Sequence, residues 1–439
     1  MDLTTGQNLI KQKKFPLALK LLKNLLILKP NNYDIYFYLG RAYSELYDYQ
    51  NGIKFYNKYL DINKNSINCL LNLAILYLNV GDKKNSEEYF KKIIKINKNY
   101  IYAYYGLFTL SRDLLKDKDI DYLKEILTNK KISFEDKSLI NFIFSKVERD
   151  NNNLDKEIYF LKEYHKNSFE SNLSYNRQSQ YYYEKLLGKI NKNINFINKN
   201  NNFKNVNPIF IVGLPRSGST LIESLLSSGD QKIKTYGESN FFNIAILEQI
   251  KNTIFDRNFK IENDMIDLDL SLIKKSINER YDLKNKTDNK ILFLDKSLEN
   301  VFNIEIILKI FPNAKFIHTK RNINDSILSI YFSMLPELSW THSLISIKKY
   351  IEDYKTTILN FQKTFPNKII EVSLDEFTVN PVKFSKEIFE FCDLIWSSKV
   401  LEFYKRKDLF SKTLSSFQIR REINKKNQSR YEKYYFLLD

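Results

Sequence analysis

The sequence has only two cysteines, Cys69 and Cys392, which are too few and too far apart for a disulfide framework or a cysteine metal site. No apolar run approaches the ~20 residues that cross a bilayer, and the N-terminus lacks the basic and apolar segments of a secretory signal. These absences predict a soluble cytoplasmic protein in a reducing compartment, with no membrane partner. No cluster of metal-ligating residues is evident, so we expect no metal site.

The formal net charge of +17 suggests anionic ligands. However, the lysines are spread along the chain, no long basic block stands out, and no nucleic-acid-binding motif is present. A lysine-rich solvated surface therefore explains the charge better than a DNA or RNA partner does. We expect no nucleic acid partner.

The N-terminal part repeats itself with an offset of 34 residues, so that Gly40 aligns with Ala74 and Tyr56 with Phe90. This spacing of small and large residues is the pattern of a tetratricopeptide repeat (TPR). One helical hairpin cannot bury its apolar face alone, so we expect about three to four hairpins to stack into a solenoid with a concave face.

At 439 residues the chain exceeds one typical domain of about 100–200 residues, which predicts two domains. We expect TPR-type repeats and capping helices over residues 1–188, an Asn- and Lys-rich linker over 189–205, and a second domain over 206–439. In the second domain strand-like and helix-like segments alternate, which indicates a parallel sheet with ligands at the carboxyl ends of its strands. His165 is predicted to be a surface histidine.

The stretch PIFIVGLPRSGST, from residue 208 to 220, predicts a buried strand, a tight loop and a helix. Backbone N–H groups and the positive end of the helix dipole would then point at one place, where an anionic phosphate binds. The spacing of Gly213, Gly218, Ser219 and Thr220 is that of a P-loop, but Ser219 stands where a P-loop has its lysine. Arg216, inside the loop, offers a planar guanidinium that can bind a phosphate or sulfate through two hydrogen bonds.

This loop resembles the 5'-phosphosulfate-binding loop of sulfotransferases, specifically the bacterial TPR-containing branch related to tyrosylprotein sulfotransferases. The resemblance implies an α + α/β chain, in which a TPR solenoid precedes a P-loop-like sulfotransferase domain with a central parallel sheet. It also implies 3'-phosphoadenosine 5'-phosphosulfate (PAPS) as sulfuryl donor, without a metal. The loop residues that would bind the donor are Arg216, Ser217, Gly218, Ser219 and Thr220.

Sulfuryl transfer needs a base for the acceptor hydroxyl and cations for the charge on the transferring group. Glu238, in the sequence TYGES, matches the Gly-Glu context of the family's base, although an exposed loop glutamate is the alternative. Lys296, in LFLDKS, resembles the family's sulfuryl-stabilising lysine. Arg216 is assigned to catalysis as well as to donor binding, and His318 is interpreted as structural.

Arg321 and Ser329 resemble the family's 3'-phosphate signature, because an arginine at a strand end and a serine on the next helix can converge on one phosphate. The alternative is an ion pair of Arg321 with Asp325 at the start of that helix. In the C-terminal segment, Ser415 and Arg430 match the residues that contact the nucleotide in the family, and Ser415 is also assigned to catalysis.

Two positions depart from the family, since Leu374 replaces a tyrosine and Ser333 replaces a second arginine. We expect a PAPS-dependent sulfotransferase whose TPR groove binds a protein or peptide acceptor, with tyrosine as a candidate, or a glycan. One alternative is a P-loop kinase or nucleotidase, for which Asp295 is the obvious magnesium ligand. Another is a non-catalytic TPR scaffold with a degenerate nucleotide domain.

Overall fold

The computed structural model describes residues 2–128, 131–190, 192–198, 202–256, 258–283, 291–406, 411–412, 418–423 and 430–439. The chain forms two compact units, each built from segments that are not contiguous in sequence. The first unit comprises Met1–Gly6, Leu21–Gln180 and Tyr331–Ile347, and the second comprises Gln7–Lys20, Tyr181–Ile330 and Lys348–Asp439. The predicted domain limits at residues 188 and 206 stay a prediction.

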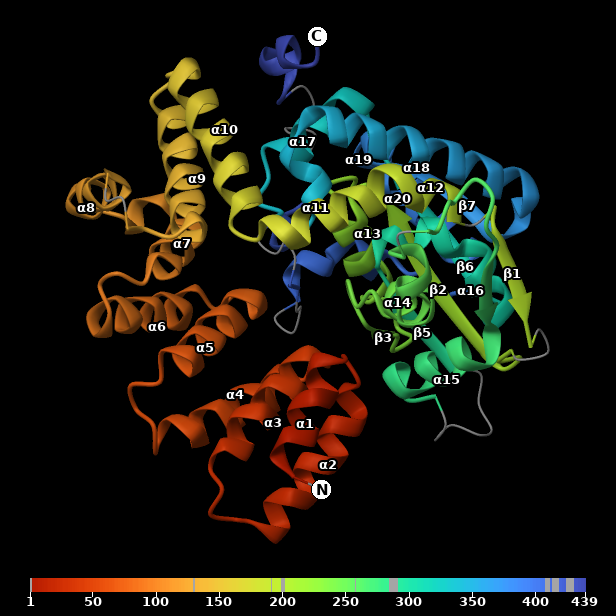
Figure 1. The fold of residues 1–439 in the computed structure, drawn as a ribbon, viewed down its shortest axis with the longest axis horizontal. Coiled ribbons are helices and arrows are strands. Elements are labelled where there is room, and N and C mark those ends of the chain that lie inside the picture. The colour runs from red at the N-terminus through yellow and green to blue at the C-terminus, as the bar shows by residue number, and fades with distance from the viewer. Residues whose placement is uncertain are drawn as a thin grey trace. The chain divides into compact units, whose positions relative to one another are not determined.

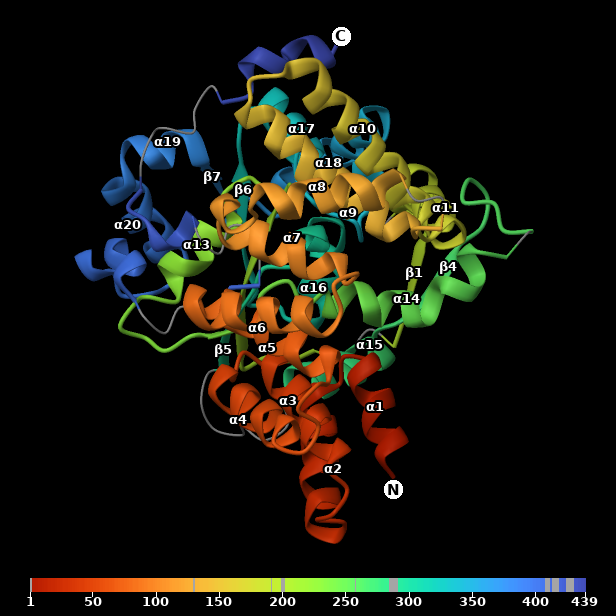
Figure 2. The ribbon, with the colours of Figure 1, turned by 90° about the vertical axis from the view of Figure 1, so that its left-hand side faces the viewer.

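The first unit is helical: helices α3 to α7 pack against one another in chain order, and α9 then packs against α7, α8 and α10 (Figure 2). The helices from the N-terminus to residue 181 are α1 (Leu3–Lys11), α2 (Phe15–Leu28), α3 (Asp34–Glu45), α4 (Tyr49–Leu60), α5 (Ile67–Val80), α6 (Lys83–Ile96), α7 (Ile101–Leu110), α8 (Asp117–Thr128), α9 (Phe134–Asp150), α10 (Leu154–Glu170) and α11 (Leu173–Tyr181). The predicted combination of a helical N-terminal region and a domain with a central parallel sheet is confirmed.

The repeat pattern has a local physical cause. Asp48 caps α4, and Asp82 caps α6 in the next repeat, each accepting a hydrogen bond from a backbone N–H of the first turn. Gly40 is small because a Cβ there would lie 2.6 Å from the ring of Tyr56. The aligned small and large residues therefore mark the close approach of paired helices.

The prediction for His165 is wrong, because its side chain is buried in the first unit. Its ring stacks on Tyr331 at 4.2 Å between centroids, its Nε2 lies 2.8 Å from the carbonyl oxygen of Tyr331, and its Nδ1 lies 3.1 Å from Nδ1 of His342. Burial lowers the pKa of His342 to about 4. The residues that bury His165 lie far along the chain, so local periodicity could not indicate them.

The second unit contains a five-stranded parallel sheet in the order β3-β5-β2-β6-β7 (Figure 1). Its strands are β2 (Val206–Gly213), β3 (Lys234–Thr235), β5 (Ile291–Asp295), β6 (Lys315–Lys320) and β7 (Ile369–Ser373). The helices of this unit from residue 182 onward are α12 (Leu187–Ile190), α13 (Ser219–Leu226), α14 (Phe241–Ile254), α15 (Leu270–Tyr281), α16 (Ile304–Ile310), α17 (Ile323–Tyr331), α18 (Leu344–Thr364), α19 (Leu374–Val379) and α20 (Pro381–Phe391).

The central strand β2 is buried on both faces, as a parallel sheet with helices on each side requires. Ile209 and Ile211 join a core cluster with α13 and α20 on one face. On the other face, Phe210 stacks on Phe316 at 5.4 Å and meets Phe242 of α14 edge-on. This double burial explains why β2 is an uninterrupted apolar run.

A smaller parallel pair joins β1 (Ile194–Ile197) to β4 (Ile266–Asp269). Strand β1 lies inside the segment for which the sequence predicted a linker. Its side chains alternate between partly buried and exposed. The surrounding Asn and Lys obscured that alternation in the sequence. The pairing partner of β1 lies beyond two further strands, β2 and β3, and the helices between them.

The turn between α1 and α2 belongs to the second unit. Arg280 of α15 donates a hydrogen bond to the carbonyl oxygen of Gln12 at 3.1 Å, and Lys14 pairs with Glu279 at 2.9 Å. Lys13 donates to the carbonyl oxygen of Ser239 at 3.2 Å. In the described part of the chain, no helix is long and apolar enough to span a membrane.

Candidate functional site

Four of the predicted site segments follow four strands of the sheet at their carboxyl ends. Glu238 follows β3, Lys296 follows β5, the loop with Arg216 follows β2, and Arg321 follows β6. Because the strands are parallel and adjacent in that order, these residues lie along one edge of the sheet. The edge therefore brings a carboxylate, an ammonium group and two guanidinium groups to neighbouring positions.

The loop after β2 is held by its own serine. The Ser217 hydroxyl donates to the carbonyl oxygen of Leu214 at 2.7 Å and shares a hydrogen bond with the Thr319 hydroxyl at 2.7 Å. Gly213 has no room for a side chain, because a Cβ there would lie 2.7 Å from the carbonyl oxygen of Thr319. The loop is thus fixed to β6, and a direct role of Ser217 in donor binding stays a prediction.

Gly218, with φ +96°, precedes Ser219 and Thr220 at the N-terminus of α13. Only glycine adopts this backbone conformation readily. The first N–H groups of a helix have no partner within it, so the loop presents donors and the positive end of the helix dipole. This is the arrangement predicted for an anion site, with Ser219 and Thr220 in its first turn.

Two other arginines act on the charge of Arg216. Burial lowers the pKa of the Arg216 guanidinium, and the positive charges of Arg430 and Arg321 lower it further, whereas Glu238 and Tyr431 raise it. Like charges that act on one group favour an anion beside it. That Arg216, Arg321 and Arg430 bind the donor together stays a prediction.

Lys296 lies between two carboxylates. Its Nζ donates to Oε1 of Glu238 at 2.5 Å and lies 3.7 Å from Oε2 of Glu223 on α13. The Lys296 side chain is fully buried, and that of Glu238 is 48% exposed. Burial opposes the charge of Lys296, but Glu238 and Glu223 outweigh it and raise its pKa, so the ammonium group stays protonated.

Asp295 connects the loops that carry Glu238 and Lys296. Its carboxylate is fully buried and accepts hydrogen bonds from the Ser239 hydroxyl at 2.6 Å, the Tyr281 hydroxyl at 2.5 Å and the Ser297 backbone N–H at 2.8 Å. Since Ser239 follows Glu238 and Ser297 follows Lys296, Asp295 fixes the backbone on both sides of the ion pair.

Arg321 forms the alternative ion pair considered above. Its Nη2 donates at 2.9 Å to Asp325, which lies in the first turn of α17, and both side chains are largely buried. The C-terminal segment packs here, because the Tyr435 hydroxyl donates to Asp325 at 3.0 Å and the Tyr431 hydroxyl to Ser329 at 3.5 Å. The two halves of the phosphate signature and the C-terminal segment are therefore together.

Four further positions that the sequence singled out lie in the C-terminal segment or depart from the family. Arg430 is exposed, and Ser415 lies outside the described residues. Leu374, the first departure, lies against the loop, since a Cβ on Gly218 would be 2.8 Å from its Cδ1. Ser333, the second departure, belongs to the first unit.

Glu223 is the residue that sequence reasoning missed. Its side chain is buried, and its Oε1 accepts a hydrogen bond from the Thr235 hydroxyl at 2.6 Å. Burial raises the pKa of Glu223, while Lys296 and Thr235 lower it. The available signal was its place as the one acidic residue of an otherwise apolar or hydroxylated helix directly after the loop.

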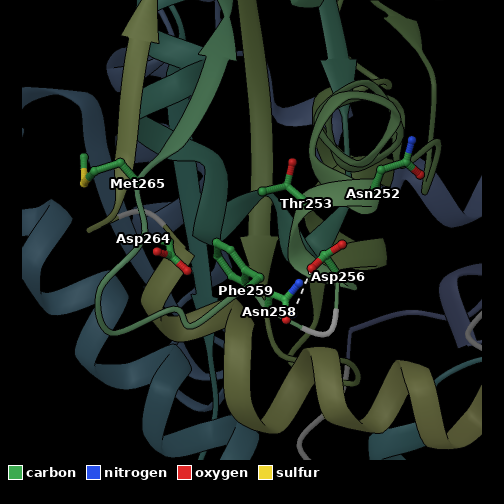
Figure 3. Close-up of a pocket in the computed structure, with 7 residues that line it drawn as sticks. All are labelled: Asn252, Thr253, Asp256, Asn258, Phe259, Asp264 and Met265. Carbon is green, nitrogen blue, oxygen red and sulfur yellow. Dashed lines mark hydrogen bonds between the residues drawn. The ribbon is translucent and has the colours of Figure 1, made fainter.

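A separate polar hollow of about 560 Å³ lies near the end of α14 (Figure 3). Its lining consists of Asn252, Thr253, Asp256, Asn258, Phe259, Asp264 and Met265. The backbone N–H of Asn258 donates to Asp256 at 2.8 Å. Among the described residues, this lining has two carboxylates and no cationic side chain.

His318 lies in strand β6 and is buried, which is compatible with the structural role interpreted from the sequence. Its ring lies beside the Tyr354 hydroxyl and 3.2 Å from the Glu371 carboxylate. The close contact with the His318 ring is the main cause that lowers the pKa of Glu371 to about 2. No group of three or more His, Cys, Asp or Glu side chains is placed to hold a metal ion within the described residues.

Comparison with known proteins agrees with this geometry. The family described as "Sulfotransferase family" matches residues 208–398, which include the loop after β2, Glu238, Lys296 and Arg321. The predicted sulfotransferase resemblance is confirmed for this segment. The tetratricopeptide repeat family matches residues 33–66 and 67–100, so the TPR prediction is confirmed as well.

An uncharacterised protein from Aquifex aeolicus (strain VF5) is 31% identical to this chain over 237 residues. The match covers 52% of this chain and 31% of that protein, so the chain spans less than a third of its relative's length.

Among solved structures, a sulfotransferase domain from the curacin biosynthetic pathway is 16% identical, with a TM-score of 0.37, over 53% of this chain and 91% of that one. MamA is 19% identical, with a TM-score of 0.31, over 38% of this chain and 95% of that one.

Proposed function

We propose that this protein is a sulfotransferase that moves a sulfuryl group from PAPS to an acceptor hydroxyl. The observation that supports this most is the row of Glu238, Lys296, the Arg216 loop and Arg321 along one sheet edge. It supplies a base, a buried ammonium group and an anion-binding loop at adjacent strand ends, which are the groups that sulfuryl transfer requires.

In this proposal Glu238 accepts the proton of the acceptor hydroxyl. The hydroxyl oxygen forms a bond to sulfur while the bond from sulfur to the bridging phosphate oxygen breaks, and that oxygen keeps the electron pair. The products are a sulfate ester and adenosine 3',5'-bisphosphate. Lys296 and Arg216 stabilise the negative charge that develops on the transferring group and the leaving phosphate.

Arg321 and Ser329 would bind the 3'-phosphate, and the N-terminus of α13 the 5'-phosphate. The three guanidinium groups of Arg216, Arg321 and Arg430 match the two separated phosphates of this nucleotide. Binding would require Arg321 to share or exchange its contact with Asp325. Ser415 is proposed to contact the nucleotide from the C-terminal segment.

We propose a protein or peptide acceptor, because TPR units commonly bind other polypeptides. A tyrosine hydroxyl is the candidate that the tyrosylprotein sulfotransferase resemblance favours, and a glycan hydroxyl is the alternative outcome. A cytoplasmic location remains part of this proposal.

The kinase or nucleotidase alternative is less compatible with the site. It needs a carboxylate free to bind magnesium near the loop, and Asp295 was the candidate. That carboxylate is fully buried and occupied by hydrogen bonds from Ser239, Tyr281 and Ser297. Ser219 also leaves the loop without the lysine that contacts a triphosphate.

The test is calorimetric titration with adenosine 3',5'-bisphosphate and, separately, with ATP plus magnesium. The bisphosphate should bind more tightly, and at 100 times its dissociation constant it should stabilise the fold by about 2.7 kcal/mol. Transfer of radioactive sulfate from PAPS to tyrosine peptides and to glycans then identifies the acceptor class. Tighter binding of magnesium-ATP would refute the proposal, and bisphosphate binding without transfer to any acceptor would favour the scaffold alternative.

A further inference from the structure

We propose that Glu223 is a positioning residue that keeps Lys296 charged and in place at the moment when Glu238 takes up the acceptor proton. The inference rests on the proposed sulfuryl transfer, and it concerns a residue outside the family signatures that the sequence offered. Its basis is that one buried ammonium group faces two carboxylates in different surroundings.

The two carboxylates differ in access. Glu238 is about half exposed and can reach an acceptor, whereas the Glu223 side chain is 11% exposed. The second oxygen of Glu223 accepts from Thr235 at 2.6 Å, and Thr235 ends the strand that leads to Glu238. Glu223 is therefore held in place by β3, with its Oε2 directed at Lys296.

The charges give the reason for a second carboxylate. Lys296 is fully buried, and a buried charge that loses its partner is strongly destabilised. When Glu238 accepts the acceptor proton it becomes neutral, and the nearest remaining negative side chain at ion-pair distance is Glu223. Asp295 also acts on Lys296, but it forms no ion pair with Lys296 within the described residues and accepts hydrogen bonds from Ser239, Tyr281 and Ser297.

Glu223 also acts before proton transfer. Its carboxylate and that of Glu238 have Lys296 as a common counter-ion, so the negative charge of Glu223 opposes the attraction between Lys296 and Glu238. Glu223 thus affects both states of the reaction, before and after proton transfer.

A double-mutant cycle on the unliganded protein tests the shared partner without any activity assay. Thermal unfolding is measured for Glu223→Gln, Glu238→Gln and the double variant. Each single variant keeps one carboxylate for Lys296. The unfolding temperature of the double variant should therefore fall by more than the sum of the two single decreases, and the excess should be on the order of a few degrees. Additive shifts would overturn the proposal.

Glu371→Gln is the matched control, because Glu371 pairs with Lys320 away from this cluster. The change that Glu371→Gln causes in the unfolding temperature should add to that of Glu238→Gln without coupling. If Glu223→Gln fails to fold, adding Lys296→Met removes the buried charge that has lost one of its two partners and should restore folding. Absence of that rescue would also overturn the proposal.

Kinetics separate this inference from the proposed function. In Glu223→Gln, kcat should fall about tenfold, with the KM for PAPS nearly unchanged and the acid side of the pH–kcat profile moved to lower pH. A full rate with an unchanged profile in an active wild-type background would remove Glu223 from the mechanism and leave the function standing. If the wild type transfers no sulfuryl group, the proposed function fails, while the cycle on the unliganded protein still decides whether the two carboxylates share Lys296.

Discussion

Lys296 and Arg321, which follow strands β5 and β6, are both buried cations that pair with a carboxylate, but the two pairs are built differently. Lys296 pairs with Glu238, which comes from another strand end, and with Glu223 from a third segment. Arg321 pairs with Asp325 one turn away on the helix that also carries Ser329. Lys296 therefore has two carboxylates with which it can pair, Glu238 and Glu223. The carboxylate that pairs with Arg321 lies within the proposed phosphate site itself.

Replacing the cation of the long-range pair should have the largest effect. Lys296→Ala leaves Glu223 buried without its counter-ion, and breaking a buried pair in this way typically costs about 3–5 kcal/mol of unfolding free energy. Urea unfolding at neutral pH measures the loss. Lys320→Ala is the matched control, since Lys320 ends strand β6 in an exposed pair, where about 0–1 kcal/mol is expected.

The loss in Lys296→Ala should depend on pH. Burial raises the pKa of Glu223 above its unfolded value, so the folded state binds a proton more readily than the unfolded state does. The deficit relative to wild type should therefore be greatest at neutral pH and shrink as the pH falls through the folded pKa toward the unfolded one. A deficit that is constant with pH would mean that Glu223 does not face Lys296.

Neutralising Asp325, the partner of Arg321, should lower the free energy of unfolding by a smaller amount, and bound nucleotide should reduce that loss. Asp325→Asn removes the charge that faces Arg321, and losing a charge-assisted hydrogen bond costs about 1.5–3 kcal/mol. With saturating adenosine 3',5'-bisphosphate the 3'-phosphate should replace that charge, so the deficit should shrink. An equal deficit with and without the nucleotide would place Arg321 outside the phosphate site. The same titration with 5'-AMP is the control, because 5'-AMP has no 3'-phosphate.

The loop between the two pairs should tolerate a methyl group poorly. Gly218→Ala forces a side chain into the left-handed region, which costs about 1–2 kcal/mol, and places its Cβ 2.8 Å from Leu374. We expect lower unfolding free energy and weaker bisphosphate binding by calorimetry. Adding Leu374→Ala should relieve the contact but leave the backbone cost, so recovery should be partial. Complete recovery would show that the backbone conformation is not what requires glycine.

The smallest effect is expected from the C-terminal segment. Tyr435→Phe removes the hydroxyl that donates to Asp325, a hydrogen bond worth about 0.5–1.5 kcal/mol. Limited proteolysis should then cut the C-terminal segment sooner. Tyr404→Phe is the control, because its hydroxyl donates to the exposed Glu422 and should matter less. Equal proteolysis of both variants would mean that the Asp325 contact does not hold the segment.

The two ion pairs also differ in how far the sequence could predict them. The pair of Arg321 with Asp325 was foreseeable, because the two residues are only four apart at the start of a predicted helix. The contact of Lys296 with Glu238 was not, although each residue was selected, because nothing local indicates that β3 and β5 are adjacent. Glu223 was missed for the same reason.

The sequence by itself determined the local features, because short-range sterics and periodicity specify them. These features are the strand, loop and helix after Pro208, the repeated caps at Asp48 and Asp82, and the position of each candidate after a strand. Only the tertiary structure decided the strand order that joins Lys296 to its two carboxylates and the burial of His165. The physical reason is that parallel strand pairing depends on contacts between distant segments, which local patterns do not encode.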